Sequence, residues 1–122
     1  MTQEKIRIVT ASDIGAVNDT WKNQGSVLDV RDTNSISIYI SYTANNSTGA
    51  QLLVYRGTAT LDCTFTMDTT SLYQKTIGDS NLEIVYDFDT KESQYLQFQT
   101  KATVIGATEG TITITVIKNR QL

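Results

Sequence analysis

Histidine and proline are both absent from the 122-residue sequence, and cysteine occurs only once, at Cys63. Histidine is the commonest general base, the usual partner of a serine or cysteine nucleophile and a frequent metal ligand, so its absence argues against most hydrolases and metalloenzymes. A single cysteine excludes an internal disulfide and a multi-cysteine metal site. We therefore expect a protein that is not an enzyme and that needs no cofactor.

Clusters of positive charge and long apolar runs are missing as well. The 10 basic residues are scattered singly in a chain of net charge −3, which disfavours nucleic-acid binding. The longest apolar runs, such as Leu52–Tyr55, are far shorter than the roughly 20 residues of a membrane-spanning helix. The first residues lack the apolar stretch of a secretory signal. We expect a soluble protein that is made in the cytoplasm and that contacts neither nucleic acid nor membrane.

What the sequence does contain is a large share of β-branched residues. Thr, Ile and Val number 20, 12 and 8 of 122 residues, and these types favour strands over helices. Short stretches with a two-residue apolar period alternate with segments rich in Asn, Asp, Ser and Gly, which is typical of a sandwich or barrel. Connections this short predict antiparallel pairing. We therefore predict one domain, residues 1–122, folded as an all-β antiparallel sandwich of about eight strands.

The clearest strand runs from Ser35 to Thr43, and one helix of poor apolar spacing is considered over Ala11 to Asn23. Weaker strands are expected over Lys5–Ala11, Ser26–Arg31 and Gln51–Arg56. In the other strands alternate residues are expected to face the core: Leu61, Cys63, Phe65 and Met67; Leu82, Ile84, Tyr86 and Phe88; Leu96, Phe98, Thr100, Ala102 and Val104; and Ile112, Ile114 and Val116.

Two pairs of acidic or amide residues are candidates for chemistry. Asp87 and Asp89 project from one face of a strand, where two carboxylates could support glycoside hydrolysis. Asp79 beside Asn81, or Asp87 with Asp89, could contribute to a calcium site, although calcium takes six or more oxygen ligands. The alternation with Tyr86 and Phe88 favours a solvated strand face instead. The sequence therefore predicts no catalytic residues and no metal ligands.

The aromatic residues allow a carbohydrate-binding module as the alternative function. Trp21, Tyr39, Tyr55 and Tyr95 could supply flat platforms on which a sugar ring stacks. Tyr39 faces away from the isoleucine stripe, and Tyr95 faces away from Leu96, so both are expected at the surface. A general protein interface is the stronger prediction for these two tyrosines, because the sequence shows no further ligand-reading set.

Several segments resemble, in their order and strand rhythm, the jelly-roll sandwiches of small virion proteins from tailed bacteriophages. This resemblance implies a jelly-roll fold, a location in the virion and a role as a capsid decoration, head-completion, tail or fibre component. It also extends to galactose-binding-like modules, but the histidine expected of sugar-binding relatives is absent. The segments that carry it are Trp21-Lys22, Ser26–Val30, Ser35–Tyr42, Leu52–Gly57, Tyr95–Lys101 and Gly110–Val116.

The last strand supplies the remaining interface candidates. The stretch Thr111–Ile117 carries no charge, and Ile117 interrupts an outward row of threonines that includes Thr113. Natural sandwiches protect open strand edges with charge or proline, and this stretch has neither. We predict a homo-oligomer or attachment to another virion protein, with Tyr39, Tyr95, Thr113 and Ile117 at the interface; the alternative is that this strand is central and covered within the monomer.

Overall fold

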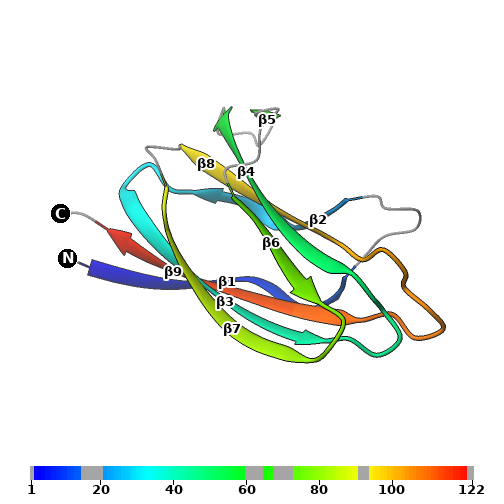
Figure 1. The fold of residues 1–122 in the computed structure, drawn as a ribbon. Helices are drawn as coiled ribbons and strands as arrows, with labels where there is room; N and C mark the ends of the chain where they lie inside the picture. Colours follow the sequence, from blue (N-terminus) through cyan, green and yellow to red (C-terminus); the bar gives the residue numbers. More distant parts are fainter. Residues whose placement is uncertain (1, 15–20, 60–64, 68–72, 91–93, 121–122) are drawn as a thin grey trace.

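The computed structural model describes residues 2–14, 21–59, 65–67, 73–90 and 94–120, and every regular element among them is a strand (Figure 1). No helix of these residues is long and apolar enough to cross a membrane. The strands are β1 (Thr2–Asp13), β2 (Lys22–Asp29), β3 (Thr33–Thr43), β4 (Ala50–Ala59), β5 (Phe65–Met67), β6 (Tyr73–Gly78), β7 (Leu82–Asp89), β8 (Tyr95–Lys101) and β9 (Thr111–Arg120).

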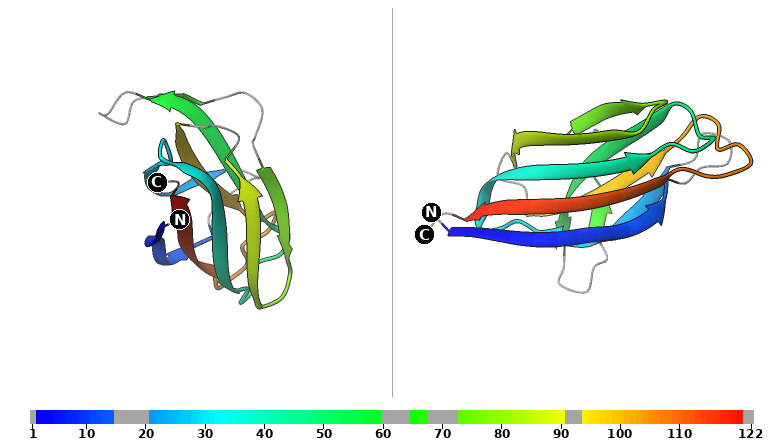
Figure 2. Two further views of the ribbon diagram at one scale, coloured as in Figure 1. Left: turned by 90° about the vertical axis from the view of Figure 1, so that its left-hand side faces the viewer. Right: turned by 90° about the horizontal axis from the view of Figure 1, so that it is seen from below.

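The strands form two antiparallel sheets that face each other (Figures 1 and 2). Sheet A has the order β1-β9-β3-β7, and sheet B has the order β2-β8-β4, with β5 and β6 both paired to the outer edge of β4. The pairs β1 with β9, β2 with β8, β3 with β7 and β4 with β6 are those of one long hairpin rolled into two layers. This is the jelly-roll arrangement, so the predicted fold class is confirmed.

The shared core lies between the sheets, where the predicted alternation places it. Ile36, Ile38, Ile40 and Tyr42 of β3 are at most 2% exposed. In β9 and β8 the predicted inward residues Ile112, Ile114, Val116, Leu96 and Phe98 are equally buried. Each large side chain removed from water in this way contributes about 1.5–3 kcal/mol to folding.

Two residues of the β8 segment differ from their expected burial. Gln97 faces outward, as the alternation predicts, but is only 6% exposed, and its amide lies 3.3 Å from the carbonyl oxygen of Gly25 and 3.2 Å from that of Phe98. Val104 was expected in the core but is 54% exposed. The strand ends at Lys101, and beyond it the backbone turns to pair with Thr48, which breaks the two-residue period.

Two further expectations need correction. The structure adds a ninth strand, β6, in which Gln74, Lys75 and Thr76 are exposed and Ile77 alone shows strong burial among the described side chains. The helix considered over Ala11 to Asn23 is wrong at both ends, which belong to β1 and β2. Leu61 and Cys63 lie outside the described residues. The structure describes only the last part of the strand expected around them, as β5 (Phe65–Met67).

Strand β2 begins at Lys22, earlier than expected, and contains a glycine, Gly25, at an irregular position. Gly25 has φ +72°, a left-handed conformation that other residues rarely adopt. A Cβ atom at this position would lie 2.5 Å from the carbonyl oxygen of Ile8. The pairing of β2 with β8 shifts register between Gln24 and Leu28. The glycine therefore lets β2 approach β1 closely at one side of the sandwich.

Candidate interface on the outer face of sheet A

Sheet A has one face in the core and one face in solvent, and its register aligns the solvent-facing side chains in rows across four strands. Partners that pair directly across antiparallel strands share a face, so the rows follow from the register. The first row is Arg7, Thr115, Tyr39 and Val85; the second is Lys5, Ile117, Ser37 and Asp87; the third is Thr113, Ser41 and Glu83.

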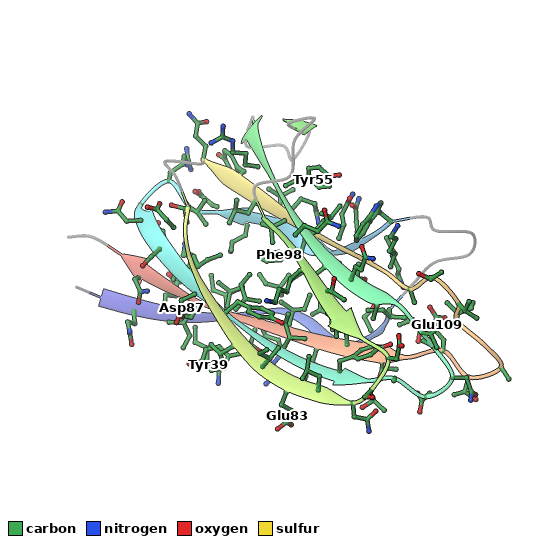
Figure 3. The ribbon with its side chains drawn as sticks, in the orientation of Figure 1. Tyr39, Tyr55, Glu83, Asp87, Phe98 and Glu109 are labelled. Carbon is green, nitrogen blue, oxygen red and sulfur yellow. The ribbon has the colours of Figure 1, made fainter. Side chains whose placement is uncertain are left out.

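This face exposes two large apolar side chains, one on β3 and one on the edge strand β7. Tyr39 is 43% exposed and Val85 is 46% exposed, and they pair directly across β3 and β7. Figure 3 shows Tyr39 on the side of sheet A that faces away from Phe98 in the core. Ile117, half-buried, lies in the neighbouring row. We call the outer surface around these three residues the Tyr39 face.

Charge divides the Tyr39 face into three zones. Strand β1 contributes the exposed bases Lys5 and Arg7 along one border, and strand β7 contributes the exposed acids Glu83 and Asp87 along the other. Between them β9 and β3 present uncharged side chains. No described residue forms an ion pair with Lys5, Arg7 or Glu83. Asp87 accepts a hydrogen bond from the Ser37 hydroxyl.

Comparison with known proteins shows what this architecture is. No protein-family model matches the chain, and no curated protein matches it. Among solved structures it is similar to SPBc2 prophage-derived protein YomS, at TM-score 0.58 and 16% identity over 96% of this chain and 92% of that chain. The similarity is one of fold. At identities below 25% a shared structure shows a shared fold and nothing more.

Two further solved structures contain a domain of the same fold. A structure of Bacillus endospore appendages, described as disulfide-linked pili, matches at TM-score 0.57 and 10% identity over 99% of this chain and 88% of that chain. A structure of infectious bursal disease virus, Gx strain, matches at TM-score 0.50 and 10% identity. That match covers 98% of this chain but 32% of the viral chain, so the sandwich is one part of the larger protein.

The structure places three of the four predicted interface residues together. Tyr39, Thr113 and Ile117 all lie on the Tyr39 face. The reason given for the last two was partly wrong, because β9 lies between β1 and β3 and is not an edge strand. Its backbone is paired on both sides, so an interface at Thr113 and Ile117 has to use side chains of the sheet face.

Tyr95 lies elsewhere, on the outer side of sheet B, and its expected exposure is wrong. It is 6% exposed, and the guanidinium carbon of Arg31 lies 5.3 Å from the centre of its ring. Asp29 holds Arg31 there through an ion pair of 2.7 Å, and the hydrogen bond from Arg31 lowers the pKa of Asp29. The Tyr95 ring is thus covered within the chain.

The aromatic residues proposed as a sugar platform do not share one surface. Tyr39 lies on sheet A, whereas Tyr55 and Tyr95 lie on the outer side of sheet B. The ammonium group of Lys101 lies 4.7 Å from the ring centre of Trp21. A cation therefore already occupies one side of two of the four rings.

The acidic candidates have ordinary structural partners. The carboxylate of Asp79 accepts a hydrogen bond of 2.6 Å from the Gly49 N–H, and the side-chain oxygen of Asn81 accepts one of 2.9 Å from Ala44. Both fix the loop between β3 and β4. Asp87 and Asp89 are exposed on β7. Within the described ranges no three Cys, Asp or Glu side chains gather where they could hold a metal ion.

Sequence reasoning missed Val85, Lys5 and Arg7 as parts of this face. Val85 carries the same kind of signal that identified Ile117, because it interrupts the outward polar positions of its strand between Glu83 and Asp87. Lys5 and Arg7 carry no local signal. Their importance depends on the register of β1 against β9, which brings them into the rows of Ile117 and Thr115.

Proposed function

We propose that this protein is a non-enzymatic structural component of a phage virion that acts through protein–protein contacts. The observation that carries the proposal is the exposed pair Tyr39 and Val85, which lie side by side on β3 and β7 on the outer face of sheet A. Contiguous exposed apolar side chains with a polar rim are typical of interaction sites, and tyrosine is enriched in the centres of interfaces. The Tyr39 face has this composition.

The similarity of fold supports a virion role. A prophage-derived protein and a virus particle contain sandwiches of the same fold, and the endospore pili show it in another repetitive assembly. The absence of histidine from the sequence removes the commonest catalytic base. We therefore favour capsid decoration, head completion or a tail position, in a particle assembled in the host cytoplasm.

The test is whether the protein is a constituent of particles. Particles from the source are purified on a density gradient, washed in high salt and probed with an antibody to this chain, both by blotting and by gold labelling in the electron microscope. We expect a constant number of copies per particle at one location. Protein that remains free in the lysate and never sediments with particles would contradict the proposal.

The alternative is a carbohydrate-binding module, and one observation favours it. The outer side of sheet B carries amides, among them Gln51, Gln74 and Gln99, near the half-exposed Tyr55, and amides are good partners for sugar hydroxyls. A glycan array distinguishes the two functions. Binding that is lost in Tyr55→Ala and retained in Tyr39→Ala would favour the carbohydrate function, whereas no binding across the array counts against it.

A further inference from the structure

We propose that the Tyr39 face docks on a second copy of this chain, about a two-fold axis that runs parallel to the strands between β9 and β3. The inference rests on the proposed function, because it names the partner that the same face binds. It follows from the way the charges of the face are distributed. A symmetric dimer requires a surface that complements itself, so that each contact occurs twice.

The border charges make the face self-complementary in one orientation. Lys5 lies at the β1 end of the second row and Asp87 at the β7 end of the same row. When two such faces are stacked about an axis parallel to the strands, β1 of one copy lies over β7 of the other. Lys5 of each copy then faces Asp87 of its mate, and the two ion pairs flank the uncharged centre.

The other in-plane axis, perpendicular to the strands, is disfavoured by the same charges. It would stack β1 on β1 and β7 on β7, which sets the Lys5 and Arg7 border against itself and the Glu83 and Asp87 border against itself. Like charges brought together across an interface suppress the wrong arrangement. The charge pattern therefore selects both the partner and its orientation.

The uncharged middle of the face fits the same arrangement, and at the ends of the first row Val85 of each copy lies over Arg7 of the other. About this axis Tyr39 of one copy lies over Thr115 of the other, which is its neighbour in the first row. Ser37 lies over Ile117 in the same way. The tyrosine rings pack beside short side chains rather than against each other, and aligned sheets pack face to face at about 10 Å.

Pairing of free strand edges would also bring β1 of one copy beside β7 of another, and the structure argues against it. The ladder of β1 with β9 shifts register twice, between Arg7 and Val9 and between Val9 and Ser12. Such irregularities twist an edge strand and hinder its extension by another chain. Edge pairing would also leave Tyr39 and Val85 exposed, and it would continue to rings or fibres instead of ending at two copies.

Two charge reversals and their mixture test the proposal. Sedimentation equilibrium on the full chain measures the dimer dissociation constant. Lys5→Glu alone and Asp87→Lys alone each turn both ion pairs into repulsive contacts, so each should raise the constant at least about tenfold. An equimolar mixture of the two variants should dimerise as the wild type does, because both contacts between unlike copies then join an acid to a base.

The controls separate association from folding. Lys22→Glu makes the same charge change at an exposed position of sheet B and should leave the dimer unchanged. Tyr39→Ser should raise the dimer dissociation constant at least about tenfold, whereas edge pairing would tolerate it. Thermal melting shows whether each variant is folded, and each altered residue is exposed, so the sandwich should melt cooperatively in all of them.

A wild-type protein that stays monomeric at millimolar concentration would overturn the inference, as would assemblies larger than a dimer or a mixture that fails to restore association. None of these results would remove the proposed function, which stands if the monomer is found on particles. Absence from particles would instead defeat the proposed function and leave the measurement of the dimer unaffected.

Discussion

The outer faces of the two sheets differ, although both come from strands with the same two-residue period. On sheet A the short side chains of Ser37, Ser41 and Thr115 surround Tyr39, which is 43% exposed, and Val85 on the edge strand β7 is 46% exposed. On sheet B Leu53 and Gln97 also point outward, yet they are 4% and 6% exposed. Their direct cross-strand partners are long side chains: Gln74 and Gln99 pair with Leu53, and Tyr55 pairs with Gln97.

The polar groups of sheet B also bind one another. The amide of Gln99 donates to the side-chain oxygen of Asn23 at 2.6 Å, and that of Gln74 donates to Gln51 at 3.3 Å. Polar groups that are paired within the chain gain little from a protein partner. The comparison teaches that exposed apolar area, and not the mere presence of aromatic residues, distinguishes the face suited to association.

The largest effect on stability is expected from substitutions at two adjacent residues of β3 that point to opposite faces of sheet A. Ile38 is fully buried, whereas its neighbour Tyr39 points to solvent. Ile38→Asp buries an unpaired charge at a cost of several kcal/mol, about the whole stability of a small domain, and should unfold the protein. The free energy of unfolding of Tyr39→Asp should lie within about 1 kcal/mol of the wild-type value. Circular dichroism on heating measures both, and a cooperatively folded Ile38→Asp would show that β3 is inverted.

The second prediction concerns association. Removing both exposed apolar groups with Tyr39→Ser and Val85→Thr should weaken it by about 2 kcal/mol or more, since central aromatic residues dominate interface energies. The matched change Tyr55→Ser on sheet B should leave it unaltered. Light scattering at micromolar concentration gives the comparison. If the variants of sheet A and sheet B lost association equally, the outer face of sheet A would not be the distinct association surface.

The third prediction compares polar residues of the two faces. Gln97→Ala should lower the free energy of unfolding by about 1–2 kcal/mol, because the buried amide contacts the carbonyl groups of Gly25 and Phe98. Ser41→Ala, at an exposed site of sheet A, should change it by less than about 0.5 kcal/mol. Urea unfolding measures both values. If Ser41→Ala proved the more costly, our account of the two faces would be wrong.

The smallest expected effect is a change in the pH dependence of stability at alkaline pH, and it arises from Tyr42 on the inner face of sheet A. Burial raises the pKa of Tyr42, so the phenol ionises more readily in the unfolded chain than in the folded one. This contribution to stability is complete below the unfolded pKa of about 10 and is lost as the pH rises above it. Tyr42→Phe should therefore lose less stability than the wild type between neutral and alkaline pH. Parallel pH profiles for the two proteins would contradict this.

The core of the sandwich was predictable where a strand has one dry and one wet side. Ile36, Ile38 and Ile40 alternate with serine or tyrosine, and such a period is typical of a half-buried strand. Strand β6 was not predictable from the sequence, because apolar and polar residues alternate only weakly along it. Its pairing with β4 is a contact between segments distant in the sequence, and a local pattern does not indicate such a contact.

The site was predictable only in part for the same reason. Tyr39 and Ile117 each break the polar pattern of their own strand, which is a local signal. The pairing of Tyr39 with Val85, and the placing of Lys5 opposite Ile117, come from the register between distant segments. The burial of Tyr95 depends on Arg31, which reaches it from a turn after β2.

The central position of β9 has a consequence for the order of events in the cell. Strand β9 is the last described strand to be synthesised, and it separates β1 from β3 in sheet A. Until β9 has left the ribosome, β1 has no partner in its sheet and the rows of the Tyr39 face are incomplete. Contacts between segments so far apart in sequence form slowly. The face is therefore complete only after β9 has been synthesised and has paired with β1 and β3, and association through it is deferred until then.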